Sequence, residues 1–383
     1  MVPPEGPGEA AERIERQVRA LTPEDVAPFV QQALGLAEVQ LGTWRTERLY
    51  GGNRGAGVFR LAGEAQVGGH KKPLPWALVI KVLRPHPIYP RRDWDLEALL
   101  YREGPFALLP AGVRAPRCYG VERRREDEWW LWLEVAEGRP GLEWGWEEFA
   151  EAARRLGHFN GAYLAGYPLP EARWLQHDAL RAYIRRYAPD VPRLWEGLEQ
   201  GHPLIARMCP PDVAADLKYL WRRRKGLLSA LDGLSQIFCH NDAGARNLFL
   251  GPGGLVAVDW DFAGRGVPGQ EIVPLCAELT NPGQFSTEEA PALREAIYAA
   301  YVEGLREAGW RGDAKQVRLG YAASFALRYA VQSAAYPAVR VLEPSRQVEL
   351  ERYWGLPIEA VMDGRREELR ALLRIAREAF ALL

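Results

Sequence analysis

Short apolar runs separated by turn residues dominate the chain from about 38 to 133. The runs at 58–61, 76–83 and 129–135 combine aromatic, β-branched and aliphatic side chains, a composition that is typical of strands. One helical stretch at 93–106 interrupts them, with apolar side chains three or four residues apart. We therefore expect a small antiparallel sheet with one helix packed on it.

Helical periodicity prevails on both sides of this region. Residues 10–35 predict two short helices, because Thr22 is a good N-cap and Pro23 suits the first helical position. After Gly138 the pattern is mostly helical, although 236–276 alternates short apolar runs with Gly, Asn and Asp. The helices predicted in this second part are 147–165, 209–232, 288–309, 313–333, 344–354 and 364–382.

Charge and length narrow the class of protein. The chain has 383 residues, which is more than one ordinary domain, and a net charge of −1 with a pI near 6.6. This balance argues against nucleic acid or an anionic membrane as the main partner. No uncharged stretch is long enough to span a bilayer, and the first ten residues lack the apolar core of a signal peptide. We therefore expect a cytoplasmic protein that binds neither nucleic acid nor membrane.

The strongest chemical signal is the octapeptide 240–247, His-Asn-Asp-Ala-Gly-Ala-Arg-Asn, which has the spacing H-x-D-x-x-x-x-N. Asp259 follows twelve residues after Asn247, at the end of an apolar run. Phosphoryl transfer needs a carboxylate beside the attacking hydroxyl and oxygen ligands for Mg²⁺. Asp242 fits the first role, and Asn247 and Asp259 fit the second. The alternative is an ordinary polar loop in which Asp and Asn are turn formers.

A second signal is Lys81, which lies within the apolar run 77–83. An unpaired buried ammonium group is costly, so this lysine should have an anionic partner. A nucleotide phosphate together with a glutamate of the following helix would serve. Glu97 and Glu103 are the candidates, and we favour Glu97 because Glu103 directly precedes Gly104-Pro105 at the expected helix end.

A weaker signal is the glycine-rich segment 51–57, which precedes the first predicted strand of the sheet. Backbone N–H groups of such a turn can approach phosphates closely because glycine has no Cβ atom. Gly52, Asn53 and Gly55 are the candidate phosphate contacts. By itself the segment predicts only a flexible hairpin turn, and its position about 30 residues before Lys81 is what adds weight to the phosphate-binding interpretation.

These three elements, in this order, resemble the aminoglycoside phosphotransferase and choline kinase branch of the protein-kinase-like fold. The likeness covers roughly 40–330 and includes 113–120 (VRAPRCYG) and 257–264 (AVDWDFAG). It implies an α+β, two-lobed protein-kinase-like fold with a small antiparallel-sheet N-lobe and a larger, mostly helical C-lobe. It also implies ATP and Mg²⁺ as cofactors.

The resemblance assigns roles residue by residue. Asp242 would be the catalytic base, Asn247 and Asp259 the magnesium ligands, and Lys81 the contact to the α- and β-phosphates, held by Glu97. The segment 133–138 corresponds to the family's hinge, where the backbone C=O of Glu134 and N–H of Ala136 would hold adenine. The implied organisation is a helical extension at 1–37, an N-lobe at 38–133, a hinge at 134–140 and a C-lobe at 141–383, with a catalytic loop at 240–247 and a metal-binding segment at 255–264.

Several roles stay open. His240 is either a general base or a buried residue that orients the loop, and we favour the second. Asp261 competes with Asp259 for the metal, and we favour Asp259 because it ends the strand directly. Many family members have Asp at the position of Glu271, which leaves a detailed role there in doubt. Arg246 replaces a residue of the usual His-Pro-Gly filler, and it either meets phosphate or substrate or forms a surface salt bridge.

Two functions remain to be separated. The first is an ATP-dependent kinase that phosphorylates a hydroxyl of a small molecule such as a sugar, an amino alcohol or an aminoglycoside-like compound. The second is a catalytically inactive nucleotide-binding regulator on the same fold, which should lack at least one of the base, the metal ligands or the strand lysine. Since all of these are present, we favour the enzyme. A protein Ser/Thr kinase is disfavoured, because Trp260-Asp261 follows Asp259 in place of Phe-Gly.

Overall fold

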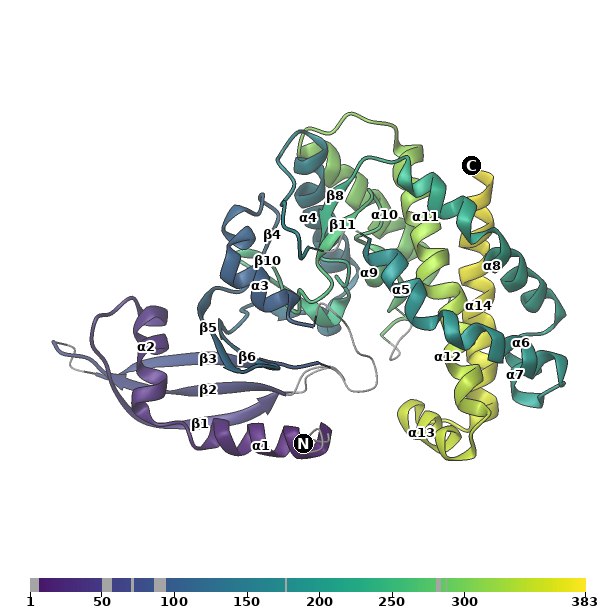
Figure 1. Cartoon of the computed structure of the whole chain (residues 1–383). Coiled ribbons are helices and arrows are strands. Elements are labelled where there is room, and N and C mark those ends of the chain that lie inside the picture. The colour runs from purple at the N-terminus through teal and green to yellow at the C-terminus, as the bar shows by residue number, and fades with distance from the viewer. Residues whose placement is uncertain are drawn as a thin grey trace. The chain divides into compact units, whose positions relative to one another are not determined.

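A computed structural model describes residues 7–49, 57–69, 72–85, 94–175, 178–279, 284–286 and 288–383. The chain divides into two compact units (Figure 1). The sheet unit comprises Met1–Leu109, Arg114–Gly138 and Val256–Asp261, and the helical unit comprises Pro110–Val113, Arg139–Leu255 and Phe262–Leu383. In the described part of the chain, no helix combines the length and the apolar character that crossing a membrane requires.

The sheet unit contains a five-stranded sheet with the strand order β1-β2-β3-β6-β5, in which every pair of neighbours is antiparallel. The three predicted strands form its middle: β2 (Gly57–Gln66), β3 (Leu74–Leu83) and β6 (Glu128–Glu134). The edge strands β1 (Gln40–Leu49) and β5 (Cys118–Arg125) were not predicted, because most of their side chains are exposed or only half-buried and many are charged. An edge strand does not need the apolar alternation by which sequence analysis finds strands.

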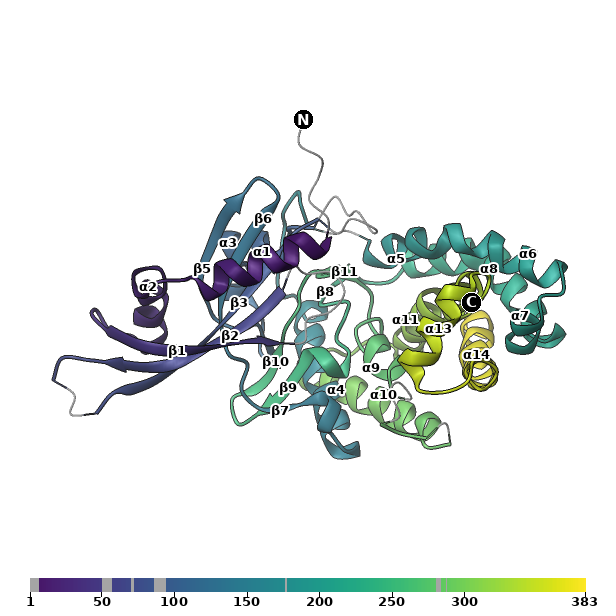
Figure 2. The same ribbon diagram turned by 90° about the horizontal axis from the view of Figure 1, so that it is seen from below.

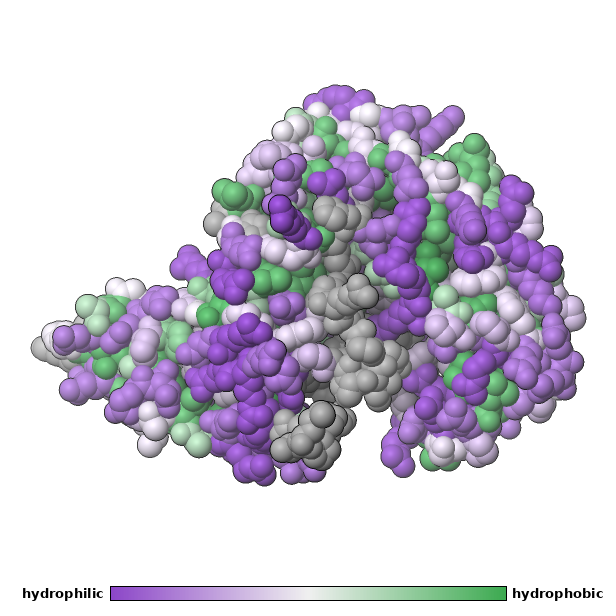
Figure 3. All heavy atoms as spheres, viewed as in Figure 1, coloured by the Kyte–Doolittle hydropathy of each residue, from purple (hydrophilic) through white to green (hydrophobic). Residues whose placement is uncertain are grey.

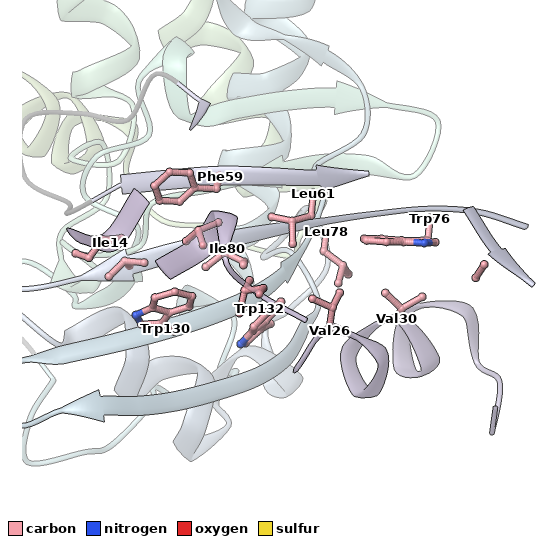
Figure 4. Close-up of a cluster of buried hydrophobic side chains, with 14 residues drawn as sticks. Ile14, Val26, Val30, Phe59, Leu61, Trp76, Leu78, Ile80, Trp130 and Trp132 are labelled. Atoms are coloured by element: carbon pink, nitrogen blue, oxygen red, sulfur yellow. The ribbon is translucent and has the colours of Figure 1, made fainter. Parts of the chain in front are cut away.

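The helices α1 (Pro7–Arg19) and α2 (Pro23–Leu34) pack on the sheet. As predicted, Pro23 begins α2, and the N–H of Thr22 is capped by the carboxylate of Asp25 at 2.9 Å. The ring of Phe29 stacks on Trp132 with a centroid distance of 4.0 Å. The shared core includes Ile14, Val26, Val30, Phe59, Leu61, Trp76, Leu78, Ile80, Trp130 and Trp132 (Figure 4).

Burial of this core stabilises the sheet unit, since each fully buried large apolar side chain contributes about 1.5–3 kcal/mol. The opposite side of α1 is rich in Glu and Arg and forms a hydrophilic surface in Figure 3. The N-terminal helices are therefore part of the sheet unit's core.

The predicted helix at 93–106 is α3 (Leu96–Glu103), and it ends at Gly104, which has a positive φ of 86°. A short 3-10 turn, η1 (Pro105–Leu108), follows it. Ala98 of α3 packs with Leu83, Trp129 and Leu131 in a second core cluster. This packing fixes α3 against the sheet and thereby positions the buried Glu97.

In the helical unit, α4 (Trp146–Leu164) and α10 (Ala290–Glu307) lie side by side in both ribbon views (Figures 1 and 2). Their backbones approach so closely that a Cβ atom added at Gly157 would lie 2.1 Å from the carbonyl oxygen of Tyr301, and one at Gly304 1.9 Å from that of Arg154. Buried Asn160 of α4 accepts a hydrogen bond from the Tyr301 hydroxyl at 2.8 Å. Only glycine permits this separation of the two helices.

The other helices of the helical unit agree with the prediction in part. The predicted helices at 209–232, 344–354 and 364–382 are α8, α13 and α14, although α14 begins earlier than predicted. The helix predicted at 313–333 continues to residue 341 as α11, a π-helical turn η5, and α12. Between 179 and 208 three further helices were not predicted, where Pro189, Pro192 and Pro203 interrupt the pattern. The bounds are α5 (Ala179–Tyr187), η3 (Ala188–Asp190), α6 (Val191–Glu199), α7 (Pro203–Met208), α8 (Pro211–Asp232), α9 (Val273–Ala277), α11 (Ala314–Phe325), η5 (Ala326–Ala330), α12 (Val331–Val341), α13 (Pro344–Trp354) and α14 (Ile358–Ala381).

Short strands frame the polar segment predicted at 236–276. The strand β8 (Ile237–Cys239) pairs antiparallel with β11 (Gly264–Gly266), and the amide of Asn160 donates to the carbonyl of Phe238 in β8. The strands β9 (Leu248–Gly251) and β10 (Gly254–Ala257) follow the turn η4 (Ala245–Asn247), and β9 pairs with β7 (Arg139–Pro140). The remaining short elements are β4 (Val113–Arg114) and η2 (Gly141–Glu143).

Candidate active site

The loop that follows β8 brings Asp242 and Asn247 together, as their spacing predicted. Both side chains are buried, and the amide nitrogen of Asn247 lies 2.9 Å from the backbone oxygen of Asp242 and 3.1 Å from its Oδ2. The turn η4 closes the loop through a hydrogen bond from the Asn247 N–H to the carbonyl of Gly244. Because these two contacts use the amide hydrogens of Asn247, its carbonyl oxygen is left as a hard ligand of the kind that Mg²⁺ prefers.

Two guanidinium groups hold the Asp242 carboxylate. Arg328 donates to Oδ1 at 2.7 Å, and Arg246 donates to Oδ2 at 2.8 Å. Since a carboxylate oxygen accepts two hydrogen bonds, Oδ1 keeps capacity for one more donor, such as a hydroxyl group. Asp242 is thus a fixed acceptor and is only 4% exposed.

The neighbouring Asn241 has a left-handed backbone conformation, with a φ of 62°, and all of its polar groups are hydrogen-bonded. Its side chain donates to the carbonyl of Phe262 and accepts from Gln270, at 3.1 and 2.7 Å. Its N–H faces the carboxylate of Glu271 at 3.5 Å, and its carbonyl accepts from Arg328. Positive φ is uncommon outside glycine and is found at sites where the surroundings enforce it. The loop is therefore held in one conformation.

Glu271 and His240 support this loop from inside. Glu271 is fully buried, and its carboxylate accepts the N–H of His240 at 3.1 Å. Burial raises the pKa of Glu271 to about 7. The imidazole Nδ1 of buried His240 lies 3.2 Å from the N–H of Asp242, which is the geometry of a residue that orients the loop. Sequence analysis left the role of Glu271 in doubt. In the structure its carboxylate faces the backbone N–H groups of His240 and Asn241.

In the sheet unit, Lys81 lies between two carboxylates. Its ammonium group donates to Glu97 and, at 2.5 Å, to Oδ1 of Asp259. Glu103, the other candidate partner, is exposed and pairs with Arg102 at 3.2 Å. Burial disfavours the charged lysine, but the negative charges of Asp259, Glu97 and Asp261 outweigh it and hold the pKa of Lys81 above its usual range.

Asp259 differs from its two partners in exposure and in backbone conformation. Its side chain is 41% exposed, whereas Lys81 and Glu97 are 13% and 1% exposed. Its φ is 66°, and among the described residues it shares a positive φ with one other non-glycine residue, Asn241. A half-exposed carboxylate held in a strained conformation beside a lysine has the chemistry of a cation ligand.

The remaining predicted contacts differ in how far the structure describes them. Glu134 ends β6, and its carboxylate binds Arg114 at 2.8 Å and the N–H of Arg117 at 2.9 Å. Ala136 lies two residues farther on, in a partly buried loop. The glycine-rich candidates Gly52, Asn53 and Gly55 lie outside the described residues.

Two residues of the site were missed or left open by sequence analysis. Arg328 lies 86 residues from Asp242, within a helical run where no local pattern marks it. Arg246 forms ion pairs with both Asp242 and Glu278, and its side chain is 47% exposed. It is therefore a half-exposed, salt-bridged residue of the loop, and it differs from the predicted surface salt bridge because its partner Asp242 is buried.

Comparisons with known proteins address the family. The sequence profile described as "Phosphotransferase enzyme family" (APH) matches residues 89–313. The chain is similar to the solved structure of choline kinase from Cryptosporidium parvum Iowa II, at 13% sequence identity and a TM-score of 0.49, over 88% of this chain and 89% of that one. It is also similar to amicoumacin kinase in complex with AMP-PNP, Ca²⁺ and Ami, at 16% identity and a TM-score of 0.49, over 90% and 96% of the two chains. A choline/ethanolamine kinase family protein from Mesorhizobium loti gives 17% identity and a TM-score of 0.48, over 97% and 99%. A comparison with curated protein sequences gave no match.

The profile match confirms the resemblance inferred from the motifs. The matched residues cover more than half of the chain, and they include the octapeptide 240–247 and Asp259. The α+β class is also confirmed, since the chain has a small antiparallel sheet unit and a larger, mostly helical unit. The chain therefore belongs to the phosphotransferase enzyme family.

Proposed function

We propose that the protein is a kinase that transfers the γ-phosphoryl group of ATP to a hydroxyl group of a small molecule. The observation that carries this proposal is the arrangement around Asp242: a buried carboxylate, fixed by two arginines, with Asn247 at 3.1 Å. A fixed acceptor beside an amide oxygen ligand provides the two functions that phosphoryl transfer needs from the protein. The family match supports the same class of reaction.

In the proposed reaction, Oδ1 of Asp242 accepts the proton of the attacking hydroxyl. A bond forms between the hydroxyl oxygen and the γ-phosphorus, the bond from that phosphorus to the β,γ-bridging oxygen breaks, and ADP leaves. Asn247 and Asp259 would hold Mg²⁺, which neutralises charge on the phosphates when it is bound. Each of the two side chains suits such an ion by its own chemistry, because Asn247 offers an amide oxygen and Asp259 offers a half-exposed carboxylate.

The other nucleotide contacts that we propose rest on the resemblance to the family. Lys81, oriented by Glu97, would bind the α- and β-phosphates, and the backbone C=O of Glu134 and N–H of Ala136 would bind adenine. Gly52, Asn53 and Gly55 would contribute backbone contacts to the phosphates. The hinge at 134–140 would connect the two lobes of the proposed organisation.

A screen of hydroxyl compounds tests the proposal, with ADP formation from ATP and Mg²⁺ as the readout. Sugars, amino alcohols and aminoglycosides form the first set. For the best acceptor, Asp242→Asn should lower kcat by about 10²–10⁴-fold, because asparagine is nearly isosteric but accepts no proton. Nucleotide affinity, measured by calorimetry, should be unchanged.

Asp232→Asn is a matched control, because Asp232 is an exposed residue of the same unit whose side chain is paired with Arg181. This control should keep wild-type activity. An Asp242→Asn enzyme with more than about a tenth of the wild-type kcat would remove Asp242 from the base role. Nucleotide binding without any ADP formation across the screen would favour the inactive regulator.

A further inference from the structure

Arg328 lies in an unusual stretch of helix. Residues Ala326–Ala330 form a π-helical turn between α11 and α12, so that one helical rod runs from 314 to 341 with an inserted residue in its middle. Single π-helical turns are rare and occur frequently at functional sites. The turn changes the direction in which the following side chains project, and Arg328 is at its centre. We infer that Arg328 is a positioning residue for the base Asp242, an assignment that rests on the proposed function.

The guanidinium group of Arg328 clamps two consecutive residues of the loop. One terminal nitrogen donates to the backbone oxygen of Asn241, and the other donates to Oδ1 of Asp242 at 2.7 Å. The planar fork of an arginine fixes the relative position of its two acceptors, which a lysine ammonium does not do. The clamp therefore sets both the backbone of the strained Asn241 and the direction of the Asp242 carboxylate.

Aromatic rings hold the clamp itself in place. The guanidinium carbon lies 4.1 Å from the ring centre of Tyr183 and 5.1 Å from that of Tyr329. Tyr183 in turn packs on Phe262, whose carbonyl accepts the side-chain hydrogen bond of Asn241. Arg328 is 6% exposed, and its Nε makes no hydrogen bond to another described residue. This side chain is thus fixed by stacking as well as by its two acceptors.

Stability alone does not account for this arrangement. A buried ion pair contributes little net stability, because the cost of removing two charges from water offsets their attraction. Arg246 already supplies a second, half-exposed positive charge to the same carboxylate. Arg328 adds a defined orientation: it occupies one acceptor position of Oδ1 and leaves the other for the hydroxyl group of the acceptor molecule.

The test compares Arg328→Gln and Arg328→Lys with the wild type, using the best acceptor from the screen. We expect Arg328→Gln to lower kcat by about 10²-fold, since a misplacement of about 1 Å at a reacting group has an effect of that size. The KM for ATP and the calorimetric affinity for ATP and Mg²⁺ should change by less than about threefold, because Arg328 acts on turnover. Arg328→Lys keeps the charge without the fork, and we expect about a tenfold lower kcat.

Arg340→Gln is the matched control, because Arg340 is on the same helical rod and stacks on Tyr336. It should keep wild-type kcat. In an Arg328→Ala variant, millimolar methylguanidinium should restore part of the lost kcat, which a general loss of structure would not allow. If Arg328→Gln does not fold, Arg328→Lys and the methylguanidinium experiment decide.

The outcomes separate this inference from the proposed function. If Asp242→Asn loses activity while the folded Arg328 variants keep wild-type kcat, the assignment of Arg328 is overturned and the proposed function stands. If Asp242→Asn keeps its activity, both are overturned. Equal losses in nucleotide affinity and in kcat for Arg328→Lys, without rescue by methylguanidinium, would also overturn the positioning role.

Discussion

The charged groups around Lys81 and around Asp242 are built in opposite ways. In the sheet unit one cation is held by two carboxylates, Glu97 and Asp259, and a third carboxylate, Asp261, raises the pKa of the lysine further. In the helical unit one carboxylate is held by two guanidinium groups. The first group carries an excess of negative charge, whereas Glu278 balances the second through its ion pair with Arg246.

This difference indicates what each group can accept. An excess of negative charge with a half-exposed member, Asp259, suits the arrival of a divalent cation together with phosphates. A charge-balanced group around a buried carboxylate suits a residue that must keep its geometry while a proton is transferred. The ion pairs around Lys81 can therefore exchange a partner when a ligand binds, whereas those around Asp242 keep the carboxylate in one position.

The largest expected effect concerns Glu271, the buried residue that supports the loop of Asp242, and it is a pH dependence of stability. Burial raises the pKa of Glu271 to about 7 from an unperturbed value of 4.5, so the neutral acid is favoured in the folded state. Its stabilising contribution is therefore fully present below pH 4.5 and is lost as the pH rises through 7. Between pH 5 and pH 8, the free energy of unfolding of the wild type should fall by about 2.5 kcal/mol relative to Glu271→Gln. Urea unfolding of both proteins at the two pH values measures this, and a difference that is independent of pH would contradict it.

The pairing of Lys81 is tested by the two glutamates of α3. Glu97→Gln removes a buried partner of Lys81 and should lower the free energy of unfolding by about 2 kcal/mol, the value typical of a hydrogen bond to a charged group. Glu103→Gln changes the same chemical group on the same helix but affects only an exposed pair, so the loss should stay below about 1 kcal/mol. Urea unfolding compares the two, and equal effects would show that Glu97 has no special role.

A substitution at Asp259 tests whether the charged group around Lys81 binds the metal ion. In Asp259→Ala, calorimetry should find ATP binding in the presence of Mg²⁺ weakened by about tenfold, or about 1.4 kcal/mol, because one charged ligand is lost. In EDTA the variant and the wild type should bind ATP equally. Asp261→Ala serves as the comparison and should lose less. Unchanged affinity for ATP and Mg²⁺ in a folded Asp259→Ala protein would show that the metal assignment is wrong.

Local patterns predicted the parts of the site that are close together in the sequence. The spacing from Asp242 to Asn247 describes one loop, and a lysine within an apolar strand requires a partner whatever the fold is. The distinction between Glu97 and Glu103 also followed from a local signal, the glycine and proline at the end of α3. Such signals depend on neighbouring residues, so a single sequence contains them.

Contacts between residues far apart in the sequence could not be predicted. Nothing near Arg328 points to a loop 86 residues away, and a π-helical turn has no recognisable composition. The packing of α1 and α2 on the sheet was also missed, because an amphipathic helix shows which of its faces is buried but not what covers that face. The edge strands β1 and β5 lack apolar alternation for a similar reason, since their stability comes from their neighbours.

The close contact of α4 with α10 limits how this chain can be recombined with its relatives. Gly157 and Gly304 set the distance between the two helices. The side chain of Asn160 hydrogen-bonds both to α10 and to β8, the strand that leads into His240, so the position of β8 depends on that distance. A chimera that takes one of these helices from a protein with a larger residue at the contact would shift β8 and the loop behind it. The two helices must therefore be exchanged together, although 125 residues separate the end of α4 from the start of α10 in the sequence.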